Sequence, residues 1–146
     1  MKKWIFPLLV LLTAGCRDNT GYDADLARDL GADTNGMKRY IIAFLKEGPH
    51  RDQSPPEMAR IQEGHYAAIR RWSEAGKLVL AGPFLDDSDL KGIFIFNLSS
   101  LSATKALAEE DPAITSGRLT LDLHPWFGSA GLMELPALHS RLVQPQ

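Results

Sequence analysis

Runs of apolar residues divide the chain into six predicted elements of secondary structure. Four short runs are rich in β-branched and aromatic residues and predict strands, at 38–45, 77–85, 91–98 and 118–126. Two longer segments have apolar residues at helical spacing and predict helices, at about 55–75 and 100–110. The last strand alternates strictly and should place three leucines on one face: Leu119, Leu121 and Leu123.

The first predicted helix has clear end signals and carries a histidine on its apolar side. Ser54 and Glu57 have the spacing of a capping box around two prolines, and Gly76 is typical of a helix end. Four residues within the helix are spaced by four, four and three positions and therefore share one face: Ile61, His65, Ile69 and Trp72. An ionisable ring thus lies where an alkyl group would pack better.

The predicted element order is β-α-β-β-α-β, with a tight turn between the two central strands. This order predicts an α+β fold of the ferredoxin-like type, in which an antiparallel sheet carries both helices on one face. The Gly82–Pro83 pair should bend or end the regular pairing of the second strand. The second sheet face needs cover, and a homodimer is the simplest way to supply it.

The N-terminal segment predicts a location in the cell envelope, and both ends of the chain lie outside the predicted domain. Residues 1–15 combine two lysines with the apolar run "WIFPLLVLL" and small residues, as a secretory signal peptide does. The sequence "LLTAGC" resembles a bacterial lipobox, which implies lipidation of Cys16; ordinary secretion to the periplasm is the alternative. In a Gram-negative host, Arg17 after that cysteine favours the periplasmic face of the outer membrane. Residues 16–36 then form a flexible tether, with at most transient helical turns, and residues 129–146 an extension that packs at an edge or dimer seam.

Composition narrows the classes of function. The formal net charge is -2, which disfavours nucleic acid as a partner because phosphate neutralisation needs a basic face. Cys16 is the single cysteine, so the chain can form no internal disulfide and no site with several thiolate ligands. The four histidines lack metal-ligand spacing, and no Gly-rich phosphate loop is present. We therefore predict neither a metal nor a cofactor.

The segments "GHYAAIRRWSEAGKLVLAGPF" and "ALAEEDPAITSGRLTLDLHPW" together resemble the YciI-like, or YCII-related, family over residues 37–128. Five short motifs occur in the expected order: a helix histidine, "AGP" after the second strand, "DP" after the second helix, a glycine soon afterwards, and a strand ending in "PW". The resemblance implies a dimeric α+β barrel with a pocket between helix and sheet. It also implies that His65 and Asp111 form the active-site pair.

The residues themselves leave two roles open for each of these positions. A buried imidazole needs a hydrogen-bond partner, so His65 is either a proton shuttle held by a carboxylate or a core histidine bonded to the backbone. Asp111 precedes Pro112 and can cap a short helical turn, orient His65, or do both. Gly82 and Pro83 suit close approach of a ligand but equally suit a bulge at a sheet corner. Trp126 should line the pocket or the dimer seam.

Two functions follow from this interpretation. The first is a cofactor-free isomerase or lyase that moves protons on a small molecule through a His65–Asp111 dyad. The second is a lipid-anchored module that binds a ligand or a partner protein, in which both residues are structural. The position of His65 relative to Asp111 distinguishes the two functions. Contact between the two side chains beside an accessible cavity favours an active site, whereas a sealed core around the ring favours a structural pair.

Overall fold

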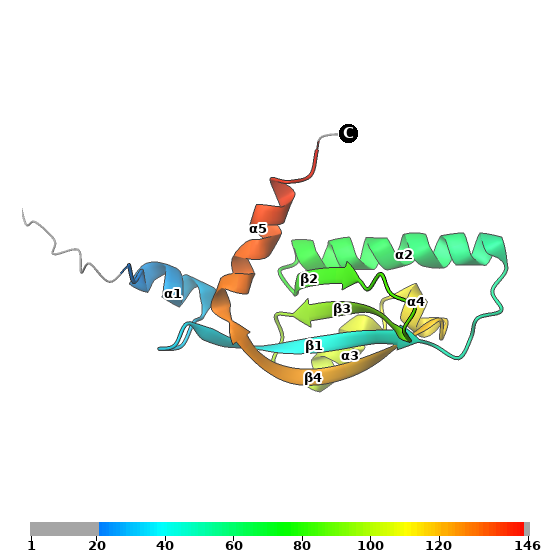
Figure 1. The fold of residues 1–146 in the computed structure, drawn as a ribbon, viewed down its shortest axis with the longest axis horizontal. Coiled ribbons are helices and arrows are strands. Elements are labelled where there is room, and N and C mark those ends of the chain that lie inside the picture. Colours follow the sequence, from blue (N-terminus) through cyan, green and yellow to red (C-terminus); the bar gives the residue numbers. More distant parts are fainter. Residues whose placement is uncertain (1–20, 145–146) are drawn as a thin grey trace, which may run out of the picture.

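The computed structural model describes residues 21–144, so the predicted signal peptide 1–15 and Cys16 lie outside the described residues. One four-stranded antiparallel sheet with strand order β2-β3-β1-β4 organises the fold (Figure 1). The elements are α1 Ala24–Leu30, β1 Met37–Glu47, α2 Pro55–Glu74, β2 Leu78–Pro83, β3 Leu90–Phe96, α3 Leu101–Ala108, α4 Pro112–Thr115, β4 Leu119–Ser129, the 3-10 helix η1 Ala130–Glu134 and α5 Leu135–Ser140.

The sheet confirms the predicted α+β, ferredoxin-like fold. The two longest strands, the central β1 and the edge strand β4, pair over their full length, from Met37 opposite Ser129 to Glu47 opposite Leu119. β3 pairs with the other side of β1, and β2 forms an edge. Pro83 is the last residue of β2, as the sequence predicted. The β2–β3 register also shifts between Leu78 and Leu80, which was not predicted.

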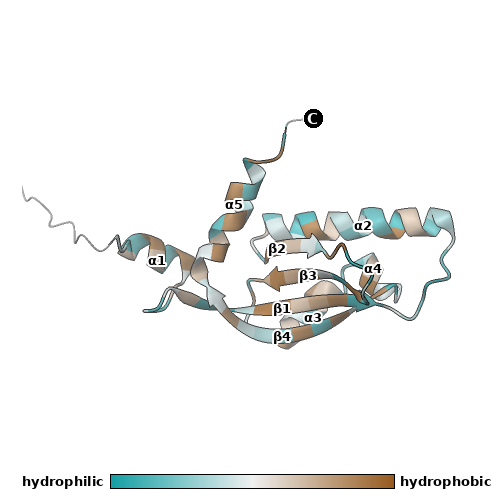
Figure 2. Ribbon diagram, viewed as in Figure 1, coloured by the Kyte–Doolittle hydropathy of each residue, from teal (hydrophilic) through white to brown (hydrophobic). Residues whose placement is uncertain are grey.

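The main core lies between the sheet and helices α2 and α3. Ala68 and Trp72 of α2 and Leu107 of α3 belong to one buried cluster with inward residues of β1 and β3. Leu119, Leu121 and Leu123 of β4 pack against this cluster, which confirms the predicted alternation. Figure 2 shows hydrophobic stretches on the strands and a mixture of polar and apolar residues along α2. The Trp72 indole meets the rings of Phe94 and Phe96 edge to face, and this aromatic packing fixes α2 over the sheet.

The opposite sheet face carries a smaller apolar cluster. Tyr40, Val79 and Ile95 are buried there, and Leu132 and Met133 of η1 pack against them. The Tyr40 hydroxyl donates a hydrogen bond to the Ser129 carbonyl oxygen at 3.0 Å. The segment after β4 thus covers part of this face within a single chain.

The two ends of the described chain are more helical than the sequence predicted. Residues 24–30, expected to belong to a flexible tether with at most transient turns, form helix α1, capped by the Asp23 side chain and ended by Gly31 in a left-handed conformation. η1 and α5 follow β4, and α5 projects away from the sheet beside the start of β2 (Figure 1). Within residues 21–144 no helix has the length and apolar character needed to cross a membrane.

Candidate active site

A histidine of α2 and an aspartate before α4 meet beneath the first long helix. The His65 Nδ1 atom lies 2.6 Å from Asp111 Oδ2. The Asp111 side chain is fully buried, and the His65 side chain is 17% exposed. The imidazole also lies against the rings of Tyr66 and Phe94, with centroids 5.9 and 6.0 Å away. The inward orientation follows from the predicted helix spacing, since Ile61 and Ile69 line the same cavity.

Asp111 divides its two carboxylate oxygens between two tasks. Oδ1 accepts a hydrogen bond from the Ala113 backbone N–H at 2.8 Å and so caps α4, whereas Oδ2 contacts His65. A carboxylate accepts hydrogen bonds, so His65 Nδ1 is assigned as the donor in this contact. Both roles considered for Asp111 therefore coexist in one side chain.

A close approach of α2 and α4 holds this pair in place. A Cβ atom added to Gly64 would lie 2.6 Å from the Cγ atom of the Pro112 ring. Only glycine at this position lets α4 approach α2 so closely, and Gly64 and Pro112 directly adjoin His65 and Asp111 in the chain. The α2–α4 contact thus sets the distance between imidazole and carboxylate.

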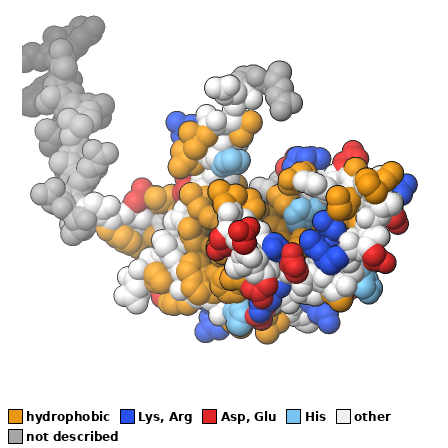
Figure 3. All heavy atoms as spheres, turned by 45° about the vertical axis from the view of Figure 1, so that its right-hand side comes forward, with side chains coloured by type: hydrophobic (Ala, Val, Ile, Leu, Met, Phe, Trp, Pro, Cys, Tyr) orange, Lys and Arg blue, Asp and Glu red, His pale blue; other side chains and the backbone are white. Residues whose placement is uncertain are grey.

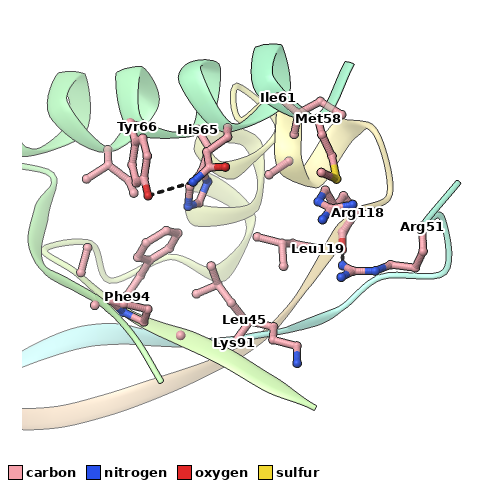
Figure 4. A pocket seen from close by; sticks show the side chains of 17 residues that line it. Leu45, Arg51, Met58, Ile61, His65, Tyr66, Lys91, Phe94, Arg118 and Leu119 are labelled. Carbon is pink, nitrogen blue, oxygen red and sulfur yellow. Dashed lines mark hydrogen bonds between the residues drawn. The ribbon is translucent and has the colours of Figure 1, made fainter. Parts of the chain in front are cut away.

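His65 opens onto a cavity of about 500 Å³ between α2 and the sheet. This volume lies within the range of pockets that bind small molecules. Leu45, Phe94 and Leu119 contribute apolar lining (Figure 4). No buried polar side-chain atom of the described residues lacks a partner, and none of their hydrogen bonds occupies His65 Nε2. The Nε2 atom therefore has accessible surface and is available to a molecule in the cavity.

Two of the three predicted binding residues line this cavity. Gly82 and Pro83 lie at its wall, at the end of β2. Trp126 does not: it pairs with Tyr40 across β1 and β4, stacks near that ring at a centroid distance of 5.9 Å, and lines a different cavity. The prediction that Trp126 shares the His65 pocket is therefore wrong for a single chain, because the side chain points to the sheet face opposite the helices.

The polar residues at the other end of the cavity were not predicted from the sequence. Arg51, Lys91 and Arg118 also line it, whereas no aspartate or glutamate of the described chain does. Figure 4 shows the guanidinium groups of Arg51 and Arg118 at one end and Tyr66 and Phe94 towards the other. The hydrogen bond drawn there joins the Gln62 amide to the Tyr66 hydroxyl at 3.1 Å. These residues come from separate elements without a local motif, so spacing alone could not reveal them.

The remaining histidines of the described chain lie apart from this site. His50 Nδ1 is 3.1 Å from the Ser116 carbonyl oxygen, and His124 Nε2 is 3.1 Å from Asp122 on the opposite sheet face. Within residues 21–144 no three histidine, cysteine, aspartate or glutamate side chains gather closely enough to hold a metal ion.

The protein thus has a ferredoxin-like fold with a pocket of small-molecule size between α2 and the sheet. A histidine of α2, bonded to an aspartate, lines this pocket. The YCII-related domain matches residues 42–126, more than half of the chain, and the protein belongs to that family. A search of curated proteins gave no match. Among solved structures, 5-chloro-2-hydroxyhydroquinone dehydrochlorinase from Burkholderia phenoliruptrix, in complex with 2,5-dihydroxybenzoquinone, is similar with a TM-score of 0.44 and 22% identity. The match covers 61% of this chain and 93% of that chain.

Proposed function

We propose that the protein is a cofactor-free enzyme that transfers protons on a small molecule, as an isomerase or lyase, with His65 and Asp111 as its acid/base dyad. The observation that carries this proposal is the 2.6 Å contact between His65 Nδ1 and Asp111 Oδ2 beside an accessible Nε2. Membership of the YCII-related family supports a role in small-molecule chemistry.

In this proposal the proton moves first from the substrate to His65. With Nδ1–H donated to Asp111, the lone pair of Nε2 faces the cavity and takes a proton from a substrate carbon or oxygen. The imidazolium that forms is stabilised by the buried Asp111 carboxylate, whose other oxygen is held by the Ala113 N–H. Nε2 then returns the proton to another substrate atom, which completes an isomerisation, or to a leaving group, which completes an elimination.

Solvent-isotope exchange tests proton transfer directly, whatever the overall reaction. The full-length chain is incubated in D₂O with a panel of cyclic lactones, enols and hydroxylated aromatic compounds, and loss of carbon-bound protons is followed by NMR. Wild type should catalyse exchange on at least one member, and His65→Ala and Asp111→Asn should not. His124→Ala is a matched control, since that histidine also contacts an aspartate but lies on the opposite sheet face. Unchanged exchange in His65→Ala, or exchange on no compound, contradicts the dyad.

A non-catalytic binding module is the alternative function. The cavity and its Gly82–Pro83 wall suit binding as well as turnover. A compound that stabilises wild type in thermal-shift assays, binds equally to Asp111→Asn and exchanges no proton would favour that alternative.

We also propose that Cys16 carries a lipid anchor and that the domain is a homodimer on the periplasmic face of the outer membrane. The lipobox-like sequence supports the anchor, and Cys16→Ala should move the protein from the membrane to the soluble fraction. The half-exposed ring of Trp126, 38% accessible on the face opposite the helices, supports dimerisation there. Trp126→Asp should then lower the mass measured by light scattering to that of a monomer. Retention in the membrane, or an unchanged mass, contradicts the respective proposal.

A further inference from the structure

The cavity beside His65 has two chemically different ends. Phe94 and Tyr66 line the end beneath α2, and Arg51, Lys91 and Arg118 line the end near the α2 N-terminus (Figure 4). On the surface, basic side chains gather next to a histidine, with acidic side chains at their edge (Figure 3). A molecule that fills the cavity therefore contacts an apolar, aromatic wall and a cationic end at once.

The charge of Arg118 is not neutralised by the described chain. Its guanidinium donates a hydrogen bond to the Gln53 side-chain oxygen at 3.0 Å, and no carboxylate of residues 21–144 forms an ion pair with it. The side chain is half-buried, so water cannot solvate it fully. A guanidinium has five N–H donors in a planar fork that matches a carboxylate, and four of the five have no acceptor among the described residues.

The two neighbouring cations are partly neutralised. Glu47 Oε1 lies 3.0 Å from Lys91 Nζ and 3.5 Å from the Arg51 guanidinium. Lys91 Nζ also donates to the Ser88 carbonyl oxygen at 2.8 Å, so its ammonium already has two acceptors. Arg51 donates to the Arg118 carbonyl oxygen at 3.2 Å, which holds its guanidinium beside Arg118. One carboxylate faces three cations, and the cavity end keeps a positive charge.

The same three cations also act on Glu47. Its pKa is held below its usual value by the hydrogen bond from Lys91 and by the charges of Lys91, Arg51 and Arg118. The potential at this end of the cavity thus favours a negative charge, including that of a ligand carboxylate.

We propose that the cavity binds a small cyclic or aromatic carboxylate, whose anionic group is held by Arg118 and Arg51 while its ring lies against Phe94 beside His65 Nε2. This inference rests on the proposed function and names its substrate class. The carboxylate fixes the orientation of the ring, so a position remote from the acid group is presented to the imidazole. Arg118 and Arg51 are binding residues in this assignment and exchange no proton.

Matched acids and amides test the assignment by their dissociation constants. Benzoate, 4-hydroxybenzoate and phenylacetate are compared with benzamide, 4-hydroxybenzamide and phenylacetamide on the full-length chain, by calorimetry or ligand-observed NMR. We expect at least one acid to bind wild type about 10-fold or more tightly than its amide, as a hydrogen-bonded charge pair predicts. Arg118→Gln should remove this ratio by weakening the acid alone, and Arg118→Lys should retain part of it.

Two further variants sharpen the test. Glu47→Gln removes the one carboxylate beside the cations and should tighten acid binding, whereas Arg70→Gln, an exposed arginine of α2 outside the cavity, should change nothing. If Arg118→Gln does not fold, as judged by circular dichroism, Arg51→Gln and Glu47→Gln carry the test. The assignment is overturned if acids and amides bind equally, or if the ratio of their dissociation constants is unchanged in the arginine variants. It is also overturned if no acid binds with a dissociation constant in the millimolar range or below.

Failure of this assignment is distinguishable from failure of the dyad. His65→Ala should retain the acid-to-amide ratio, because the imidazole does not hold the carboxylate. A retained ratio without isotope exchange in any protein leaves the anion site standing and contradicts proton transfer. Isotope exchange on neutral compounds, together with equal binding of acids and amides, supports proton transfer and contradicts the anion site.

Discussion

Gly64 offers the sharpest test of how the fold positions the candidate site. In Gly64→Ala the new Cβ atom must move from 2.6 Å to at least 3.4 Å from Pro112 Cγ to reach ordinary contact, a displacement of about 0.8 Å. If α4 takes up that displacement, the His65–Asp111 distance grows from 2.6 Å to about 3.4 Å, beyond the range of a good N–H···O hydrogen bond.

The energetic consequences of this substitution have opposite signs. Alanine in a helix is more favourable than glycine by about 1 kcal/mol, whereas overpacking costs about 1–3 kcal/mol. We therefore expect a net loss of roughly 0–2 kcal/mol in the free energy of unfolding and a much larger effect on the site. Misplacement by about 1 Å can lower turnover by about 100-fold.

NMR of the His65 imidazole measures this effect without a substrate. In wild type the Nδ1 proton, hydrogen-bonded to a buried carboxylate, should exchange slowly and resonate far downfield. In Gly64→Ala that signal should shift upfield or broaden into the solvent line. The double variant Gly64→Ala/Pro112→Ala removes the clashing Cγ atom and should restore it. An unchanged signal in Gly64→Ala, or no recovery in the double variant, refutes the role of this contact.

Three further predictions concern stability. Asp111→Asn should keep the acceptor for the Ala113 N–H and lower the free energy of unfolding by about 1.5–3 kcal/mol through loss of the His65 bond. Asp111→Ala should lose about 1 kcal/mol more, because the helix cap is lost as well. Equal urea midpoints for the two variants would contradict the assignment of separate tasks to the two oxygens. Hydrogen bonds from the Ser54 hydroxyl and backbone N–H lower the pKa of Glu57 below its usual 4.5, so this contribution is present above pH 4.5 and is lost as pH falls through the folded-state pKa. Melting temperatures of wild type and Glu57→Gln should accordingly differ at about pH 6 and converge near pH 3; a constant gap argues against the capping carboxylate. Trp72→Ala, at a site 2% exposed, should cost about 3–5 kcal/mol in chemical unfolding, and a loss below about 1 kcal/mol would show that the aromatic cluster repacks.

Local patterns predicted the elements well because they depend on neighbours within a few residues. The capping-box spacing before α2 and the three alternating leucines of β4 describe contacts that any chain with these residues would favour. The same alternation places Trp126 on the face opposite Leu119, Leu121 and Leu123, so the sequence already held the information that excludes Trp126 from the His65 cavity.

Contacts between distant elements were less accessible to prediction. α1 and η1 have too few apolar residues for a clear period, yet Leu132 and Met133 find partners on the sheet. The β2 register shift and the close approach of Gly64 to Pro112 likewise depend on the packing of separate segments.

By itself the sequence determined the strand and helix order and the inward orientation of His65, because helix spacing acts along the chain, and it offered capping as one of two roles for Asp111. Only the tertiary structure decided that the Asp111 oxygen left over from capping meets His65, and that Arg51 and Arg118 converge on the same cavity. The physical reason is that a functional pocket is assembled from the ends of several elements, whose relative placement is fixed by long-range packing against a shared core.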